Sequence, residues 1–130
     1  MPIENLDPAG AHAAMQSGAP HVFLDVRTPA EFAGGHPAGA TNVPWALPDP
    51  ASGMMAPNPA FLAEVRRIAP PERRIFVSCQ SGGRSMGACR DLAQAGYADL
   101  VNVAGGFGGG RDAYGRPITG WRDAGLPVER

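Results

Sequence analysis

Short apolar runs recur along the chain, and segments with helical features separate them. Four of these runs have the length of strands: residues 22–26 (VFLDV), 41–44 (TNVP), 74–78 (RIFVS) and 100–103 (LVNV). Short runs that are apolar rather than alternating are typical of strands covered on both faces. The pattern therefore predicts a largely buried sheet.

Helix-start signals lie between the apolar runs. A capping residue followed by proline predicts a helix start at three places, Asp7, Thr28 and Asn58. Glu31 lies three residues after Thr28, which is a capping-box pattern. A fourth helix is expected from about Arg84 to Ala95, where Gly96 would end it.

Strands that alternate with helices predict an α/β fold, with a central parallel sheet and helices on both faces. The 130 residues fit a single domain, 1–130. Residues 46–57 are rich in proline and small residues and are expected to form a surface loop, although Met54 and Met55 could line a pocket there. A final short helix is expected over residues 120–125.

Composition narrows the possible functions. Hydrophobic residues make up 44% of the chain and charged residues 18%, as in globular proteins. The net charge of −1 gives no basic surface for nucleic acid or acidic membranes. No signal peptide or membrane span is visible, so we expect a cytoplasmic protein with no nucleic-acid or membrane partner.

The two cysteines form neither a Cys-x-x-Cys pair nor a zinc spacing with the three histidines. No metal site is therefore expected, and a free thiol would survive in a reducing compartment.

The segment CQSGGRS, residues 79–85, has the features of a reaction centre. Cys79 follows the run 74–78, and parallel sheets place their sites at the carboxyl ends of strands. The reactive form of cysteine is the thiolate, which Gly82 and Gly83 could favour by letting backbone N–H groups converge. The start of the next helix and the guanidinium of Arg84 would add positive potential.

A lone cysteine after a strand is usually a core residue, but this combination favours catalysis. We therefore predict Cys79 as the catalytic residue. The predicted substrate-binding residues are the rest of the segment: Gln80, Ser81, Gly82, Gly83, Arg84 and Ser85.

This segment resembles the active-site loop of the rhodanese (sulfurtransferase) family, which runs Cys-x-x-Gly-x-Arg. Residues 24–44 (LDVRTPAEFAGGHPAGATNVP) resemble the family's N-terminal motif, and residues 101–107 and 120–129 resemble its C-terminal motif. The similarity covers nearly the whole chain and implies a single rhodanese-like domain.

The resemblance also implies a reaction. Cys79 would take sulfur from a small anionic donor such as thiosulfate, and the resulting persulfide would pass sulfur to cyanide or a thiol. No cofactor is implied, and a sulfur-relay protein is a further possible partner.

Two alternatives stay open. A sulfur carrier would keep the same loop but turn over slowly with free thiosulfate. A rhodanese module that only binds partners belongs to the same alternative, but such modules typically lose the cysteine or the loop glycines, and this chain keeps both. A cysteine-loop phosphatase or arsenate reductase is a weaker alternative, because such phosphatases have one residue more between cysteine and arginine and also need a general acid.

Other polar and sulfur-containing residues are expected to be structural. Asp25 and Arg27 are predicted to form a buried ion pair or to support a turn, His36 to make hydrogen bonds in a turn, and Trp121 to lie in the core. Cys89 lies on the apolar stripe of its helix and is expected to be buried, neutral and well away from the loop. The segment GGFGGG (105–110) does not complete a dinucleotide-binding fingerprint.

Overall fold

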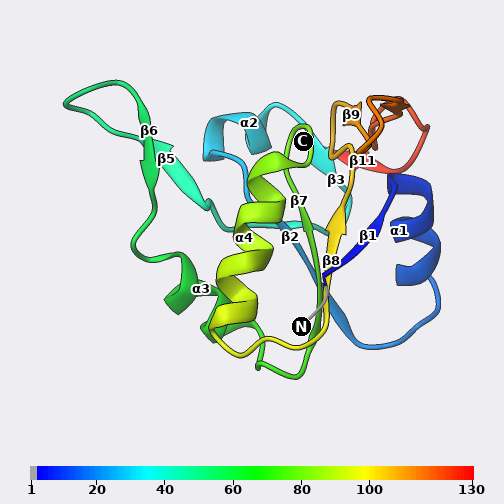
Figure 1. Ribbon diagram of the computed structural model, residues 1–130, viewed down its shortest axis with the longest axis horizontal. Helices are drawn as coiled ribbons and strands as arrows, with labels where there is room; N and C mark the ends of the chain where they lie inside the picture. The colour runs from blue at the N-terminus through cyan, green and yellow to red at the C-terminus, as the bar shows by residue number, and fades with distance from the viewer. Residues whose placement is uncertain (1–2) are drawn as a thin grey trace.

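Five parallel strands form the centre of the molecule (Figure 1). The computed structural model describes residues 3–130. The strands lie in the order β1-β8-β7-β2-β4. Their bounds are β1 Glu4–Leu6, β2 His21–Asp25, β4 Thr41–Asn42, β7 Arg74–Ser78 and β8 Leu100–Val103. The predicted parallel α/β architecture is confirmed.

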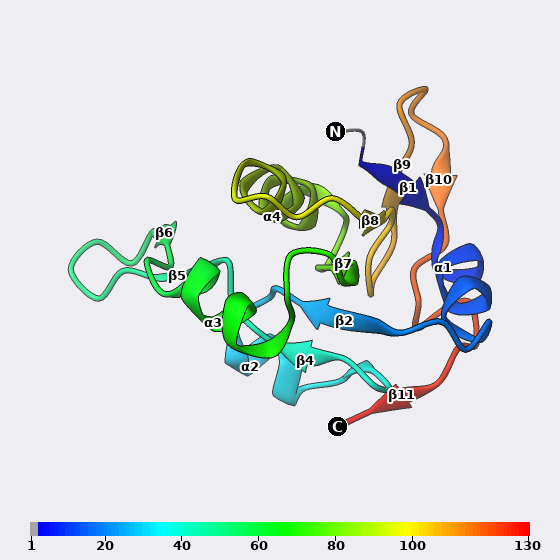
Figure 2. The ribbon, with the colours of Figure 1, turned by 90° about the horizontal axis from the view of Figure 1, so that it is seen from below.

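Alternate residues of the central strand β7 enter opposite cores, because successive side chains of a strand point to opposite faces. On β7, Ile75 and Val77 join a core with α3 (Phe61–Ile68) and α4 (Gly83–Gln94). Phe76 joins the other core, with α1 (Pro8–Met15) and Trp121. Figure 2 shows α3 and α4 on one side of the sheet and α1 on the other.

The predicted helix caps are confirmed at two of the three positions. The Asp7 carboxylate accepts a hydrogen bond from the Gly10 N–H at 2.8 Å. Thr28 and Glu31 form the complete capping box of α2 (Pro29–Ala33). Asn58 is not the cap of α3: it accepts from the Ala60 N–H at 3.1 Å, and the helix begins only at Phe61.

Residues 46–57 are not an irregular loop. They form a β-hairpin of β5 (Ala46–Pro48) and β6 (Met55–Pro57), which projects from the body of the protein (Figure 1). The Asp49 N–H donates to the Met54 carbonyl at 2.7 Å just beyond the paired strands. Apolar and polar residues do not alternate in this segment, so the sequence pattern does not predict the pairing of β5 with β6.

Residues 121–125 form turns, so the helix expected over residues 120–125 is absent. The Ala124 N–H donates to the Gly120 carbonyl at 2.9 Å, but Gly125 follows with a left-handed φ of 75°. The segment is held by the Trp121 side chain, which is 1% exposed and donates to the Pro127 carbonyl at 2.6 Å. The prediction that Trp121 lies in the core is confirmed.

Several strands were not expected, because elements of two or three residues carry no periodicity. Besides β1 and the β5–β6 hairpin, they form two further antiparallel pairs: β3 (His36–Pro37) with β11 (Val128–Glu129), and β9 (Gly110–Arg111) with β10 (Pro117–Ile118). Within residues 3–130, no helix is both long and apolar enough to cross a bilayer.

Candidate active site

Cys79 follows the carboxyl end of β7 and faces α4. It continues the alternation of Ile75 and Val77, and all three side chains belong to the same core. Only 1% of Cys79 is exposed to solvent. The thiol therefore lies at the edge where the topology places a site, but beneath the segment that follows it.

The loop after Cys79 turns back over the sulfur. Gly82 has a left-handed φ of 111° and is the N-cap of α4. This conformation suits glycine, which has no Cβ to clash. It brings the Gly82 N–H to 3.1 Å from the Cys79 Sγ. A backbone donor and the positive end of α4 thus both stabilise negative charge on the sulfur.

Ser85, one turn into α4, also contacts the sulfur. Its Oγ lies 3.4 Å from the Cys79 Sγ and 3.0 Å from the Gly82 carbonyl oxygen. The side chain is completely buried. The structure thus brings together Cys79, Gly82 and Ser85 of the predicted site.

Arg84 is bound to a partner that the sequence did not indicate. Its two terminal nitrogens donate to the Glu31 carboxylate at 2.8 and 3.0 Å. The hydrogen bonds from Arg84 are the main cause that lowers the pKa of Glu31 from 4.5 to about 2. Likewise, Glu31 raises the pKa of Arg84, and the negative charge of Cys79 adds to this effect.

Gln80 is held from the other side by a buried ion pair. The Arg27 Nη1 donates to the Gln80 Oε1 at 3.2 Å, and the Arg27 Nη2 lies 2.8 Å from the Asp25 carboxylate. Asp25 and Arg27 are 1% and 3% exposed, so the predicted buried pair is confirmed. The Arg27 guanidinium also lies over the Phe107 ring, 4.7 Å from its centroid.

The glycine-rich segment 105–110 packs against the back of the loop. The Phe107 N–H donates to the Cys79 carbonyl at 2.8 Å, and the Gly108 N–H donates to the Gln80 carbonyl at 2.9 Å. A Cβ on Gly106 would lie 2.4 Å from the Cys79 carbonyl oxygen. Glycine is thus required for this backbone-to-backbone approach, a role that the sequence pattern alone did not reveal.

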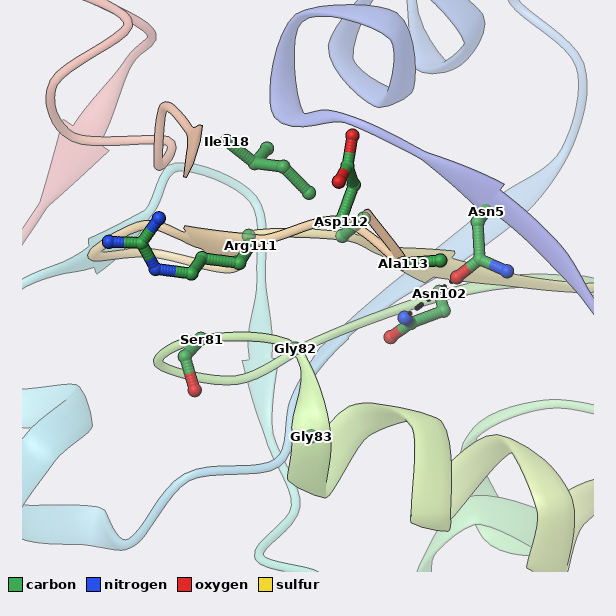
Figure 3. Close-up of a pocket in the computed structure, with 11 residues that line it drawn as sticks. Asn5, Ser81, Gly82, Gly83, Asn102, Arg111, Asp112, Ala113 and Ile118 are labelled. Atoms are coloured by element: carbon green, nitrogen blue, oxygen red, sulfur yellow. Dashed lines mark hydrogen bonds between the residues drawn. The ribbon is translucent and has the colours of Figure 1, made fainter. Parts of the chain in front are cut away.

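Ser81 and Gly83 are exposed and border a pocket of about 470 Å³ beside the loop (Figure 3). Its other walls come from Gly82, from Asn5 on β1, from Asn102 on β8 with the segment that follows it, and from the hairpin of β9 and β10. Neither Ser81 nor Gly83 contacts the sulfur by a hydrogen bond among the residues described. Their predicted role in substrate binding stays a prediction.

A second pocket, of about 340 Å³, lies beside Arg84. Trp45, Met55 and the β5–β6 hairpin line it. Met54, by contrast, is 72% exposed near the end of the hairpin. Met55 is therefore a pocket residue and Met54 a surface residue.

The other expected structural roles are largely confirmed. His36 makes the expected hydrogen-bonding contact, with its Nδ1 2.8 Å from the Phe32 carbonyl oxygen, and its ring stacks on Phe32. It lies in β3, however, and not in a turn. Cys89 is fully buried, and burial raises the pKa of its thiol to about 12. The charge of Cys79 contributes to this rise, because both cysteines belong to the same core; the expectation that Cys89 lies well away from the loop is wrong.

Comparison with known proteins gives consistent results. The family model described as Rhodanese-like domain matches residues 7–113. Thiosulfate sulfurtransferase 16, chloroplastic, of Arabidopsis thaliana is 40% identical over 92% of this chain and 87% of its own length. Thiosulfate sulfurtransferase GlpE of Haemophilus influenzae is 29% identical over 99% of this chain and 97% of its own length.

The fold also matches solved structures. The crystal structure of Rv0390 from M. tuberculosis superposes with a TM-score of 0.79 at 33% identity, covering 99% of this chain and 98% of that one.

Proposed function

The chain belongs to the rhodanese-like domain family, and from this premise we propose that it is a sulfurtransferase that carries sulfur as a persulfide on Cys79. The observation that carries the proposal is the position of the Cys79 Sγ, 3.1 Å from the Gly82 N–H at the N-terminus of α4. This environment favours a thiolate before reaction and an anionic persulfide after it.

The proposed cycle has two displacements. The Cys79 thiolate attacks the outer sulfur of thiosulfate; a new S–S bond forms, the bond to the sulfonate sulfur breaks, and sulfite leaves with the electron pair. Cyanide or a thiolate then attacks the terminal sulfur of the persulfide. The S–S bond breaks, the acceptor keeps the sulfur, and Cys79 leaves as a thiolate.

Neither displacement needs a protonated leaving group, because sulfite and the Cys79 thiolate are both stable anions. Sulfur transfer therefore needs no general acid, whereas phosphate ester hydrolysis does, because its alkoxide leaving group has to be protonated. Four residues separate Cys79 from Arg84, one fewer than in cysteine-loop phosphatases. This shorter spacing favours sulfur transfer over phosphatase or arsenate reductase chemistry.

Arg84 would attract the anionic donor to the mouth of the loop. Its guanidinium shares its charge with Glu31, so the donor would use the N–H groups that do not face that carboxylate. Charge-assisted hydrogen bonds of this kind are worth about 1.5–3 kcal/mol each.

Mass spectrometry tests the proposal directly. Thiosulfate should add one sulfur atom to the purified protein, and cyanide should remove it. Cys79→Ser should neither gain sulfur nor produce thiocyanate, whereas Cys89→Ser should do both. Thiocyanate production by Cys79→Ser at the wild-type rate would refute the proposed role of Cys79.

A sulfur carrier that serves a protein partner is the second candidate. Exposed methionines favour it, because Met54 and Met55 are 72% and 48% exposed on a projecting hairpin, and such side chains adapt to partner surfaces. A carrier would form a long-lived persulfide yet turn over slowly with thiosulfate and cyanide. Rapid multiple turnover with these small molecules would exclude it.

Aryl phosphate and arsenate test the remaining alternatives. The wild-type protein should show negligible phosphate release and negligible arsenate reduction under conditions in which it transfers sulfur. Robust turnover of either oxyanion substrate, lost in Cys79→Ser, would favour a phosphatase or an arsenate reductase over a sulfurtransferase.

A further inference from the structure

A chain of polar side chains leads away from the Cys79 sulfur through the interior. Ser85 Oγ contacts the sulfur at 3.4 Å and also hydrogen-bonds the side-chain amide of Asn102. The Asn102 amide in turn hydrogen-bonds the side-chain amide of Asn5 at 3.0 Å (Figure 3). Asn102 is a polar residue that is only 4% exposed, in a strand where its neighbours Val101 and Val103 are apolar core residues.

The direction of the hydrogen bonds in this chain depends on the state of the sulfur. With a neutral thiol, the Cys79 S–H donates to Ser85, the Ser85 O–H donates to the Asn102 Oδ1, and the Asn102 Nδ2 donates to the Asn5 Oδ1. Each group is then a donor to the next group outward. In this direction the single hydroxyl proton of Ser85 faces away from the sulfur.

A thiolate cannot donate, so it needs a donor in place of an acceptor. Each primary amide has two N–H donors at one end and an acceptor oxygen at the other. If both amides rotate by 180°, Asn5 donates to Asn102 and Asn102 donates to Ser85. The Ser85 O–H then no longer donates to Asn102 and can donate to the sulfur, with the Gly82 carbonyl oxygen, 3.0 Å away, as the competing acceptor. The same atoms thus make the same number of hydrogen bonds in the opposite direction.

We infer that Asn102 and Asn5 are positioning residues of a reversible hydrogen-bond chain, which turns the Ser85 hydroxyl toward Cys79 when the sulfur is anionic. The inference rests on the proposed function, in which Cys79 is a thiolate both as attacking group and as leaving group. The chain itself carries no proton outward. The proton that leaves the Cys79 thiol goes to water or to a buffer base.

The outer end of the hydrogen-bond chain, at Asn5, lies where reversing the direction of the hydrogen bonds costs little free energy. Asn5 is exposed and borders the 470 Å³ pocket, so solvent can satisfy whichever end of its amide faces outward. Asn102 is flanked by hydrogen-bonding groups on both sides, so it stays satisfied in both orientations. A carboxylate at either position could only accept, and it would hold the chain in the direction that suits the thiol.

Other charged and titratable groups lie around the loop and the asparagine pair and have to be held constant in a test. They are Arg84 and Cys89 on α4, Glu31 on α2, the Asp25–Arg27 pair at the end of β2, and Arg111 and Asp112, which line the same pocket as Asn5 and Asn102. None of them contacts Asn5 or Asn102 through a hydrogen bond among the residues described. Substitutions in the asparagine pair therefore leave this set intact.

The experiment follows thiolate formation by ultraviolet absorbance as a function of pH, in a Cys89→Ala background in which Cys79 is the only thiol. Asn5→Asp should raise the pH midpoint of thiolate formation by about one unit, which is about a tenfold lower thiolate fraction well below the midpoint. Asn102→Asp should raise it further. Because position 5 is exposed, Asn5→Asp is informative even where Asn102→Asp fails to fold.

Ala113→Asp is the matched control, because Ala113 borders the same pocket but takes no part in the hydrogen-bond chain. It should move the midpoint by less than Asn5→Asp, and high salt should remove its effect but not that of Asn5→Asp. Equal midpoints for the two variants at high salt would overturn the inference. The titration needs no sulfur donor, so a failure of the proposed sulfur transfer would appear separately, in the thiosulfate assay.

Discussion

Arg84 and Glu31 are joined by two parallel hydrogen bonds, of 2.8 and 3.0 Å, between α4 and the start of α2. Glu31 also completes the capping box of α2 with Thr28. One carboxylate thus stabilises a helix start and holds the arginine of the candidate active site. The two functions of Glu31 can be separated by substitution.

The first prediction concerns donor binding. Arg84→Ala should reduce sulfur transfer from thiosulfate by roughly ten- to a hundredfold, because it removes charge-assisted hydrogen bonds to the anion. Glu31→Gln, which frees the guanidinium, should instead lower the KM for thiosulfate. Steady-state kinetics of both variants would show this. Unchanged kinetics in both would mean that the pair only supports the loop.

The second prediction concerns stability in acid. Because the pKa of Glu31 in the folded protein is about 2, below its ordinary 4.5, its contribution to stability is complete above pH 4.5 and disappears as the pH falls toward 2. The carboxylate is about one-third exposed, so solvent screening limits the contribution to about 1 kcal/mol. Urea unfolding at a series of pH values should show this loss in the wild type. Glu31→Gln should lack that component of the pH dependence.

The third prediction concerns the glycine-rich segment. Gly106→Ala should abolish or strongly reduce sulfur transfer, since its Cβ would displace the Cys79 carbonyl. Gly115→Ala is the matched control: Gly115 also has a left-handed φ, 78°, but nothing lies within 4 Å of its Cβ position. It should cost about 1 kcal/mol of stability and leave activity intact. Equal activity losses in the two variants would contradict the packing argument.

The fourth prediction concerns the buried pair behind Gln80. Asp25→Ala would leave the Arg27 guanidinium buried without its carboxylate, which should cost about 3–5 kcal/mol. Asp123→Ala, which breaks the exposed pair with Arg122, should cost less than about 1 kcal/mol. Denaturant unfolding of both variants measures the difference. Comparable, small losses would show that the buried pair contributes no more than a surface pair.

The fifth prediction concerns Cys89. Cys89→Ala should keep sulfurtransferase activity and lose about 1 kcal/mol of stability by underpacking. The reason is that burial raises the pKa of this thiol to about 12, so it is neutral and unreactive at physiological pH. Oxidised wild-type protein should therefore contain no Cys79–Cys89 disulfide. A rapidly formed disulfide, or activity lost without unfolding, would give Cys89 a role in the mechanism.

The sequence by itself determined the local features of this protein. Apolar runs predicted β2, β7 and β8, and the capping box at Thr28 predicted α2, because strand burial and helix caps depend on residues within a few positions of one another. The segment 79–85 identified Cys79 for the same reason: the cysteine, the glycine turn and the helix start that surround the sulfur are consecutive in the chain.

Only the tertiary structure decided which distant residues support that loop. Glu31 is 53 positions from Arg84, and Asn5 is 97 positions from Asn102, so no local pattern connects them. The role of the glycines in residues 105–110 depends on the fold, which places their backbone against Cys79 and Gln80. Such contacts arise from the parallel packing of strands far apart in the sequence, which brings their carboxyl ends to one edge whatever their separation along the chain.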